Sequence, residues 1–241
     1  MQSYLALKGI HKIMNIFAIG DLHLSISVGP EKAMDMFGDA WKNHTEKLKT
    51  NWLKLITDED VVILPGDFSW AMKLEEAMPD FEWLKTLPGK KVFVRGNHDL
   101  WWSSLKKMKM LYPEITFIQN DSVIINGVAI MGSRGWISPE DSDFSEENDR
   151  PIYERERLRF QMSFDTLKGK EYKKLICATH FPPFGFKDLF KEFGVENVVY
   201  GHLHGEPAFN NGPEGLIDGI EYRLVSFDKL KGVPQLICKV D

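Results

Sequence analysis

The chain has 241 residues, of which 43% are hydrophobic and 27% charged, and its formal net charge is −5. This composition is ordinary for a folded globular protein. The mildly acidic balance argues against a dedicated binder of long nucleic acid, which needs a basic surface to neutralise phosphates. The acidic charge does not exclude a small phosphorylated substrate, because a metal site can supply positive charge locally. No stretch approaches the roughly 18 apolar residues of a membrane span, so we expect no membrane span.

Apolar runs that are typical of strands alternate with stretches of helical periodicity in the first half of the chain. The predicted strands there are 14–19, 61–64 and 91–94, and the predicted helices lie within 31–57, at 74–87 (irregular at Pro79) and at 101–112, with Asp99 as N-cap. Short strands follow at 116–118, 123–125 and 128–131, and Asn126-Gly127 predicts a two-residue hairpin. The remaining predictions are helices at 153–167 and around 189–193, and strands at 175–178, 198–200, 222–226 and 235–240. The pattern predicts one α/β domain with mixed sheets and helices on the outside.

The first residues and the two cysteines indicate how the chain is organised and where it is located. Residues 1–13 are short and mixed, without the apolar centre of a signal peptide. We interpret them as an extension or cloning remnant before a single domain at 14–241. Cys177 and Cys238 each lie in an apolar run, and free cysteine prefers the interior. We therefore predict buried thiols, no disulfide framework and a cytoplasmic location.

Metal-capable side chains follow the ends of five predicted strands. They are Asp21 and His23, Asp67, Asn97 and His98, His180, and His202 and His204. Because ligands of open α/β sheets bind at the carboxyl ends of strands, we expect these side chains to converge. The glycines just before Asp21, Asp67, Asn97 and His202 fit sharp turns at those ends.

Imidazole and carboxylate without thiolate suit divalent Mn, Fe, Zn or Co. These side chains are too many for one tetrahedral site, whereas two sites that share a bridging carboxylate would use them. Two metals about 3.5–4 Å apart can hold the attacking and leaving oxygens of an in-line displacement. The cluster is therefore suited to a pair of divalent metals.

The same residues form five sequence blocks. The blocks are Gly20-Asp21-Leu22-His23, Gly66-Asp67, Gly96-Asn97-His98-Asp99, His180 and Gly201-His202-Leu203-His204. In their order and rough spacing they resemble the calcineurin-like metallophosphoesterases. The resemblance implies a sandwich of two mixed β-sheets flanked by helices, and hydrolysis of phosphate esters.

The resemblance also implies a role for each residue. Asp21, His23 and His204 would bind one metal, Asn97, His180 and His202 would bind the other, and Asp67 would bridge the two. A hydroxide held between the metals would be the nucleophile. His98 would protonate the leaving oxygen instead of binding metal, and Asn97 is also a candidate substrate contact.

Three positions bear comparison with the commonest family pattern. Leu24 stands where many members have Gly, although some branches, including lipid A precursor hydrolases, also carry Leu. Trp70 stands where the protein phosphatases have an acid that orients the catalytic histidine, which leaves a pairing of His98 with a carboxylate unsupported. The block at His180 continues Phe181-Pro182, close to the usual His-x-Pro.

Other side chains near the blocks are candidates for substrate contact. Arg134 could clamp a phosphate oxygen or form a surface salt bridge, and the sequence does not separate the two. Arg95 is interpreted as structural. Core packing is the more usual fate of Trp70, Trp101, Trp102 and Trp136 than an aromatic wall for a leaving group. The acidic stretch 138–150 is more typical of a solvated loop than of a lid.

The sequence thus predicts a metal-dependent hydrolase of small phosphate esters. Phosphodiesters are slightly favoured, because monoesterases often place several arginines near the site. The alternative from another class is a catalytically silent protein-interaction scaffold of the same fold, which is disfavoured because every ligand position is filled. A nuclease is a further alternative, and the acidic balance disfavours it.

Overall fold

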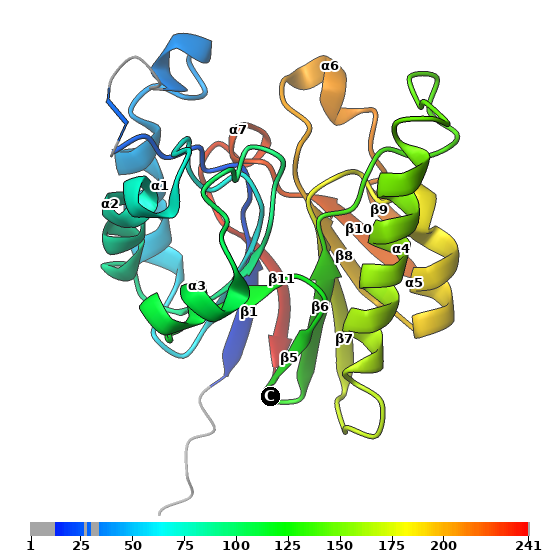
Figure 1. The fold of residues 1–241 in the computed structure, drawn as a ribbon. Helices are drawn as coiled ribbons and strands as arrows, with labels where there is room; N and C mark the ends of the chain where they lie inside the picture. The colour runs from blue at the N-terminus through cyan, green and yellow to red at the C-terminus, as the bar shows by residue number, and fades with distance from the viewer. Residues whose placement is uncertain (1–12, 27, 30–33, 241) are drawn as a thin grey trace, which may run out of the picture.

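The computed structural model describes residues 13–26, 28–29 and 34–240. The prediction of an extension at residues 1–13 therefore lies outside the described residues, apart from Ile13. Figure 1 shows two β-sheets in the middle of the molecule, with helices on their outer faces. The predicted sandwich of two mixed sheets is confirmed. None of the helices formed by the described residues has both the length and the apolar character that a membrane span needs.

The first sheet has five strands in the order β11, β1, β2, β3, β4, and only β11 runs antiparallel to its neighbour. The strands are β1 (Met14–Ala18), β2 (Val61–Pro65), β3 (Lys90–Val94), β4 (Ile115–Ile118) and β11 (Gln235–Val240). Every residue of β2 is buried, as expected for a central parallel strand that is covered on both faces.

The second sheet has six strands in the order β5, β6, β7, β8, β10, β9, with antiparallel strands at both edges. The strands are β5 (Ser122–Ile125), β6 (Val128–Ser133), β7 (Lys174–Thr179), β8 (Asn197–Tyr200), β9 (Gly215–Ile217) and β10 (Ile220–Leu224). Asn126 and Gly127 join β5 to β6 with φ angles of 47° and 79°, as a hairpin turn with two positive φ angles requires. The hairpin is therefore confirmed, whereas β9 was not predicted because three residues are too few to show a period.

Strand residues alternate between the layer between the sheets and the layers under the helices. Along β1, Ile16 and Ala18 lie between the sheets, and Phe17 lies in the layer under the helices. The layer between the sheets consists mainly of valine, isoleucine and alanine, whereas both outer layers are rich in aromatic residues. These aliphatic side chains fill the layer between the two sheets.

Helices cover both outer faces of the sandwich (Figure 1). The longer ones are α1 (His44–Leu55), α2 (Leu74–Lys85) and α3 (Leu105–Leu111) beside the first sheet, and α4 (Arg150–Asp165) and α5 (Lys187–Phe193) beside the second. Short turns of helix lie in the loops at Met34–Phe37, Phe184–Phe186, α6 (Glu206–Phe209) and α7 (Phe227–Leu230). The side chain of Ser104 caps α3 by accepting a hydrogen bond from the backbone of Lys107, so the predicted N-cap at Asp99 is wrong.

Candidate metal centre

The seven predicted ligands lie in loops after five strand ends. Three of these strands, β1, β2 and β3, belong to the first sheet, and β7 and β8 belong to the second. Asp21, His23, Asp67 and His180 are each at most 2% exposed. Four titratable side chains are rarely buried together without a strong partner, so their geometry decides what the site can hold.

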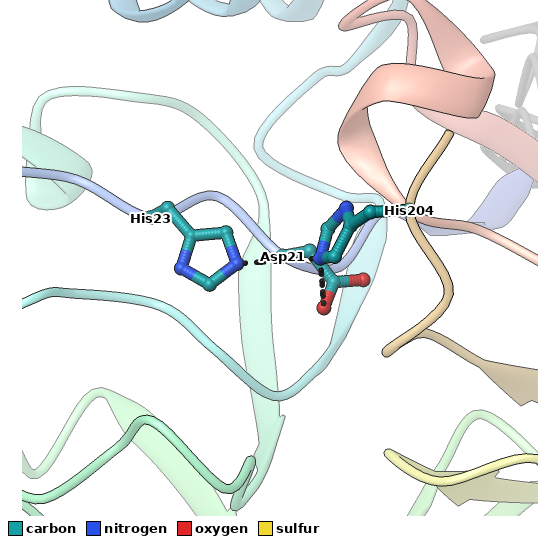
Figure 2. A group of neighbouring side chains, drawn as sticks. All are labelled: Asp21, His23 and His204. Atoms are coloured by element: carbon teal, nitrogen blue, oxygen red, sulfur yellow. Dashed lines mark hydrogen bonds and ion pairs between the residues drawn. The ribbon is translucent and has the colours of Figure 1, made fainter. Parts of the chain in front are cut away.

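A first group consists of Asp21, His23 and His204 (Figure 2). One ligand atom from each residue lies within 4.8 Å of those of the others. Nε2 of His23 and Nε2 of His204 are 3.4 Å apart, and Nε2 of His204 lies 3.6 Å from a carboxylate oxygen of Asp21. Two imidazole nitrogens and one carboxylate oxygen thus face the same point.

A second group consists of Asp21, Asp67 and His180. Asn97 and His202 lie against it, because Oδ1 of Asn97 is 2.6 Å from Nε2 of His180 and 2.9 Å from Nδ1 of His202. The two imidazole nitrogens themselves are 3.2 Å apart. The residues predicted for a second metal are therefore neighbours.

Asp67 lies between the two groups. Its Oδ2 atom is 3.4 Å from Nε2 of His180 and 3.9 Å from Nε2 of His23. Its other oxygen accepts a hydrogen bond of 2.8 Å from the backbone N–H of His98. Asp21 also belongs to both groups, so two carboxylates are in position to be shared.

The hydrogen bonds behind the histidines test whether the groups fit cations. Nδ1 of His180 lies 3.0 Å from the carbonyl oxygen of Pro65, which can only accept, so Nδ1 carries the proton. Nδ1 of His204 faces the carboxylate of Asp228 at 3.1 Å in the same way. In the neutral rings the Nε2 lone pairs then face the oxygen and nitrogen atoms of the other candidate ligands. This arrangement fits divalent cations, and it is the usual environment of metal-binding histidines.

The pKa values describe the same centre without metal. Burial acts to raise the pKa of Asp21, but the hydrogen bond with His204 and the charges of nearby histidines hold it well below its usual range. Burial and the charge of Asp21 raise the pKa of Asp67 to about 8. Burial acts to lower the pKa of His204, but Asp21 and Asp228 raise it to about 10. Protons on Asp67 and His204 thus supply charge that bound cations would otherwise supply.

Backbone strain is concentrated at the site. Asp21, His23, Asp67 and His202 have φ angles of 55°, 44°, 52° and 73°, in the left-handed region that residues other than glycine rarely adopt. Such conformations cost about 1–3 kcal/mol each and persist where the surrounding structure enforces them. Four strained residues among the predicted ligands indicate that the loops are shaped for the site.

The glycines of the blocks have a different role from the one predicted. Of the four, only Gly66 has a positive φ angle. A methyl group at Gly96 would collide with the carboxylate and backbone of Asp67, and one at Gly201 would collide with the carboxylate of Asp21. These two glycines therefore make room for buried carboxylates, and the turn strain lies on the ligand residues.

Two aspartates that support the site were assigned wrongly or missed. Asp99 is fully buried and accepts hydrogen bonds from the backbone N–H groups of Gly96, Asp67 and Phe68, so it holds the two loops together. Asp228, which orients His204, was not predicted. It follows the predicted strand 222–226, so the strand-end signal that found the ligands could have found it.

His98 and Trp70 stand at the entrance to the site. His98 is partly exposed, and the loss of water around the rest of its ring together with the charge of His180 lowers its pKa below its usual value. The Trp70 ring stacks on His23 with 4.6 Å between centroids, and it contacts His98 edge-on at 4.7 Å. The residue that replaces the acid of the protein phosphatases thus packs directly against the candidate general acid.

A cavity of about 510 Å³ opens beside these residues. Its walls are metal-site residues on one side and mainly apolar side chains on the other. The lining residues are His23, Met34, Phe37, Asp39, Ala40, Trp41, Asp67, Trp70, His98, His202, His204, Gly205 and Asp228. Such a cavity can receive an organic group attached to a phosphate.

The remaining candidates divide between core and site. Trp101 and Trp102 are buried in the core layer under the helices, as predicted for most tryptophans. Trp136 lies under the guanidinium of Arg134, 4.6 Å from ring centroid to Cζ. Arg134 is 16% exposed and forms a 4.0 Å ion pair with the buried Glu156, so its salt bridge lies inside the protein instead of at the surface. Its contact with a phosphate oxygen stays a prediction.

Comparison with known proteins gives the family. A family model described as calcineurin-like phosphoesterase matches residues 14–206. The chain belongs to this family. Membership confirms the resemblance of the five blocks and assigns the chain to the metal-dependent phosphoesterases.

Two solved structures are similar to this member of the calcineurin-like phosphoesterases. A phosphopantetheinyl hydrolase from Mycobacterium tuberculosis has a TM-score of 0.58 and 16% identity, over 93% of this chain and 95% of that chain. A protein of unknown function from Aquifex aeolicus has a TM-score of 0.52 and 18% identity, over 92% and 95%. These likenesses show the fold. No curated protein matches the chain.

Proposed function

We propose that the protein hydrolyses phosphate esters with two divalent cations, of Mn, Fe, Zn or Co. Asp21, His23 and His204 would hold one cation, and Asn97, His180 and His202 would hold the other, with Asp67 between them. The observation that carries this proposal is the convergence of imidazole nitrogens and carboxylate oxygens in two adjacent groups. When bound, two such cations lower the pKa of water and polarise the phosphoryl group, which supplies a nucleophile at neutral pH.

The chain's own residues would do the remaining work. Pro65 and Asp228 fix the tautomers of His180 and His204, which keeps the ligand nitrogens aimed at the site. His98 would give its proton to the departing oxygen, since it lines the cavity. None of the described carboxylates forms an ion pair with it. The apolar wall of Met34, Phe37 and Trp41 would receive the leaving group and keep water from it.

We propose an ester substrate of small size. The net charge of −5 and the acidic Asp39 and Asp228 at the cavity weigh against a nuclease. The complete ligand set weighs against a silent scaffold. The preference for phosphodiesters over phosphomonoesters remains a prediction. It rests on the assumption that few arginines lie near the site. A cytoplasmic location is likewise proposed, on the two unpaired cysteines.

The test combines metal content with turnover. The protein is loaded with Mn²⁺, its bound metal is measured by elemental analysis, and hydrolysis of bis(p-nitrophenyl) phosphate and p-nitrophenyl phosphate is followed. We expect two metals per chain and metal-dependent turnover. His98→Ala should lower kcat and keep both metals, whereas Asp67→Asn should lose metal and activity together.

Two results would contradict the proposal. Equal metal loss in both variants would make His98 a ligand. A protein that holds at most one metal and turns over neither ester with any of the four metals would favour the scaffold.

A further inference from the structure

Lys91 is a buried lysine without a counter-ion. It is the second residue of β3, and it is 8% exposed. Phe93 lies in the layer under the helices, and Lys91, two residues before it, shares that face of the strand. Lysine is almost never buried to this extent unless it is paired, yet Lys91 makes no ion pair with any residue that the structure describes.

The hydrogen bonding of Lys91 suits a neutral amine. Its Nζ atom donates to the carbonyl oxygen of Leu87, which is its one hydrogen-bond acceptor among the described residues. An ammonium group has three N–H donors, so two of them would lack a protein acceptor here. Burial lowers the pKa of Lys91 from 10.5 to about 8, although the charges of Asp58 and Glu114 oppose this. At about pH 7.5 such an amine is neutral in roughly a quarter of the molecules, against about one in a thousand for an ordinary lysine.

A cavity of about 300 Å³ gives access to this amine. It lies at the amino ends of β3 and β4, whereas the candidate metal ligands follow the carboxyl ends of their strands. The cavity is therefore separate from the metal centre. The charged groups that line it together with Lys91 are Asp58 before β2, Lys85 on α2, Lys90 on β3 and Glu114 before β4.

The adduct that fits this site is an amide with a small acyl group. An amide nitrogen keeps one N–H, which can still donate to the carbonyl oxygen of Leu87. The amide is neutral, so its burial avoids the cost of desolvating an ammonium group. A carboxylated amine would instead place a negative charge beside Asp58 and Glu114, and a methylated amine would retain the positive charge. The site therefore favours acylation over these two modifications.

We propose that Lys91 is a modification site, at which a small acyl phosphate acylates the Nζ atom without the help of another enzyme. The neutral amine attacks the carbonyl carbon of the acyl phosphate, and a C–N bond forms. The C–O bond to the phosphate group breaks, and inorganic phosphate leaves with that electron pair. The amine gives up one proton to the solvent. This reaction does not depend on the proposed hydrolase function, because the metal centre lies at the other end of the strands.

The rates of acetylation at neighbouring lysines test the proposal. The full-length protein is treated with acetyl phosphate at about pH 7.5, and acetylation of each lysine is followed by peptide mass spectrometry. Lys90 is the matched control, because it is the next residue in the chain and lines the same cavity but is exposed. We expect Lys91 to react about tenfold faster than Lys90, because its larger neutral fraction outweighs its poorer access. Exposure alone would give the opposite order, so an equal or slower rate at Lys91 would overturn the proposal.

A variant and a pH series separate the charge state of Lys91 from its accessibility. Asp58→Asn removes a negative charge that favours the ammonium form, so the rate at Lys91 should rise about twofold relative to Lys90. Asp143→Asn, at an exposed position far along the chain, should leave the ratio unchanged. In the wild type the ratio should fall as the pH rises above about 8, since Lys91 is already mostly neutral there. A slower reaction of Lys91 in Asp58→Asn, or a ratio that does not change with pH, would show that its charge state does not make it reactive.

Discussion

Nδ1 of His204 lies 3.1 Å from a carboxylate oxygen of Asp228, whose other oxygen accepts a 2.9 Å hydrogen bond from the backbone N–H of Gly205. The carboxylate thereby fixes both the tautomer and the direction of the ring. A carboxylate behind a metal-binding histidine also raises its basicity. Asp228 therefore contributes to the site although it is not itself among the candidate ligands.

Replacing Asp228 should weaken metal binding. We expect Asp228→Asn to lower the affinity for the cation at Asp21, His23 and His204 about 10- to 100-fold. Competition with a fluorescent chelator measures this affinity. Asp143→Asn, at an exposed position of the 138–150 loop, is the control. Identical affinities in the two variants would show that the contact does not support the ligand.

Asp67 should make the stability of the metal-free protein depend on pH. Its pKa rises from 3.8 to about 8 on folding, so the folded state retains a proton that the unfolded chain releases. The folded state is therefore favoured most below about pH 4, and this contribution is lost as pH rises towards 8. Asp67→Asn removes the titrating group, so its melting temperature should rise relative to wild type between pH 4 and 8.

Metal should reverse that order. Cations that bind only the folded wild type stabilise it by about 2.7 kcal/mol at 100 times the Kd. With saturating Mn²⁺ at pH 8, wild type should melt above Asp67→Asn, and removal of the metal by a chelator should restore the first order. Parallel melting curves of the two proteins at every pH, with or without metal, would contradict the role of Asp67.

Gly96 should tolerate no side chain. Alanine there meets the carboxylate and the backbone of Asp67, both of which are buried. We expect Gly96→Ala to destabilise the protein by about 3 kcal/mol or more and to lose metal. Gly169→Ala is the control, because Gly169 has a φ of 75° but open space around it, and it should cost only about 1–2 kcal/mol. Urea denaturation measures both.

Trp70 should position His98. Its ring contacts His98 at 4.7 Å and stacks on His23 at 4.6 Å. Trp70→Ala should lower kcat about 10- to 100-fold through misplacement of the histidine, with both metals retained. Trp70→Phe should recover most of the rate. Trp83→Ala, in the helix layer, controls for lost packing. If Trp70→Ala loses metal while kcat per bound metal is unchanged, Trp70 supports the ligand His23 and does not position His98.

The sequence predicts the sandwich and the convergence of its ligands well, since both depend on where strands end. Apolar runs such as Val61–Pro65 are followed by glycine, and parallel strands bring those ends to one edge. The Asn126-Gly127 hairpin could be predicted equally well, because a turn with positive φ angles at two successive residues favours asparagine followed by glycine.

Contacts between segments that lie far apart in the sequence were harder to predict. Asp99 precedes a predicted helix and resembles a cap, but its partners Asp67 and Phe68 are some thirty residues away. The wall formed by Met34, Phe37 and Trp41 could not be predicted, because no sequence motif marks it. Its apolar residues are equally typical of a hydrophobic core.

The candidate ligands come from both sheets of the sandwich. His23 and His204 are 181 residues apart in the chain, yet their Nε2 atoms face each other at 3.4 Å. A cation held by this pair would close a loop of that length, as a disulfide does in a secreted protein. It would act as a reversible cross-link between the two layers, so chelation should speed amide hydrogen exchange in the loops after β1 and β8 before either sheet unfolds.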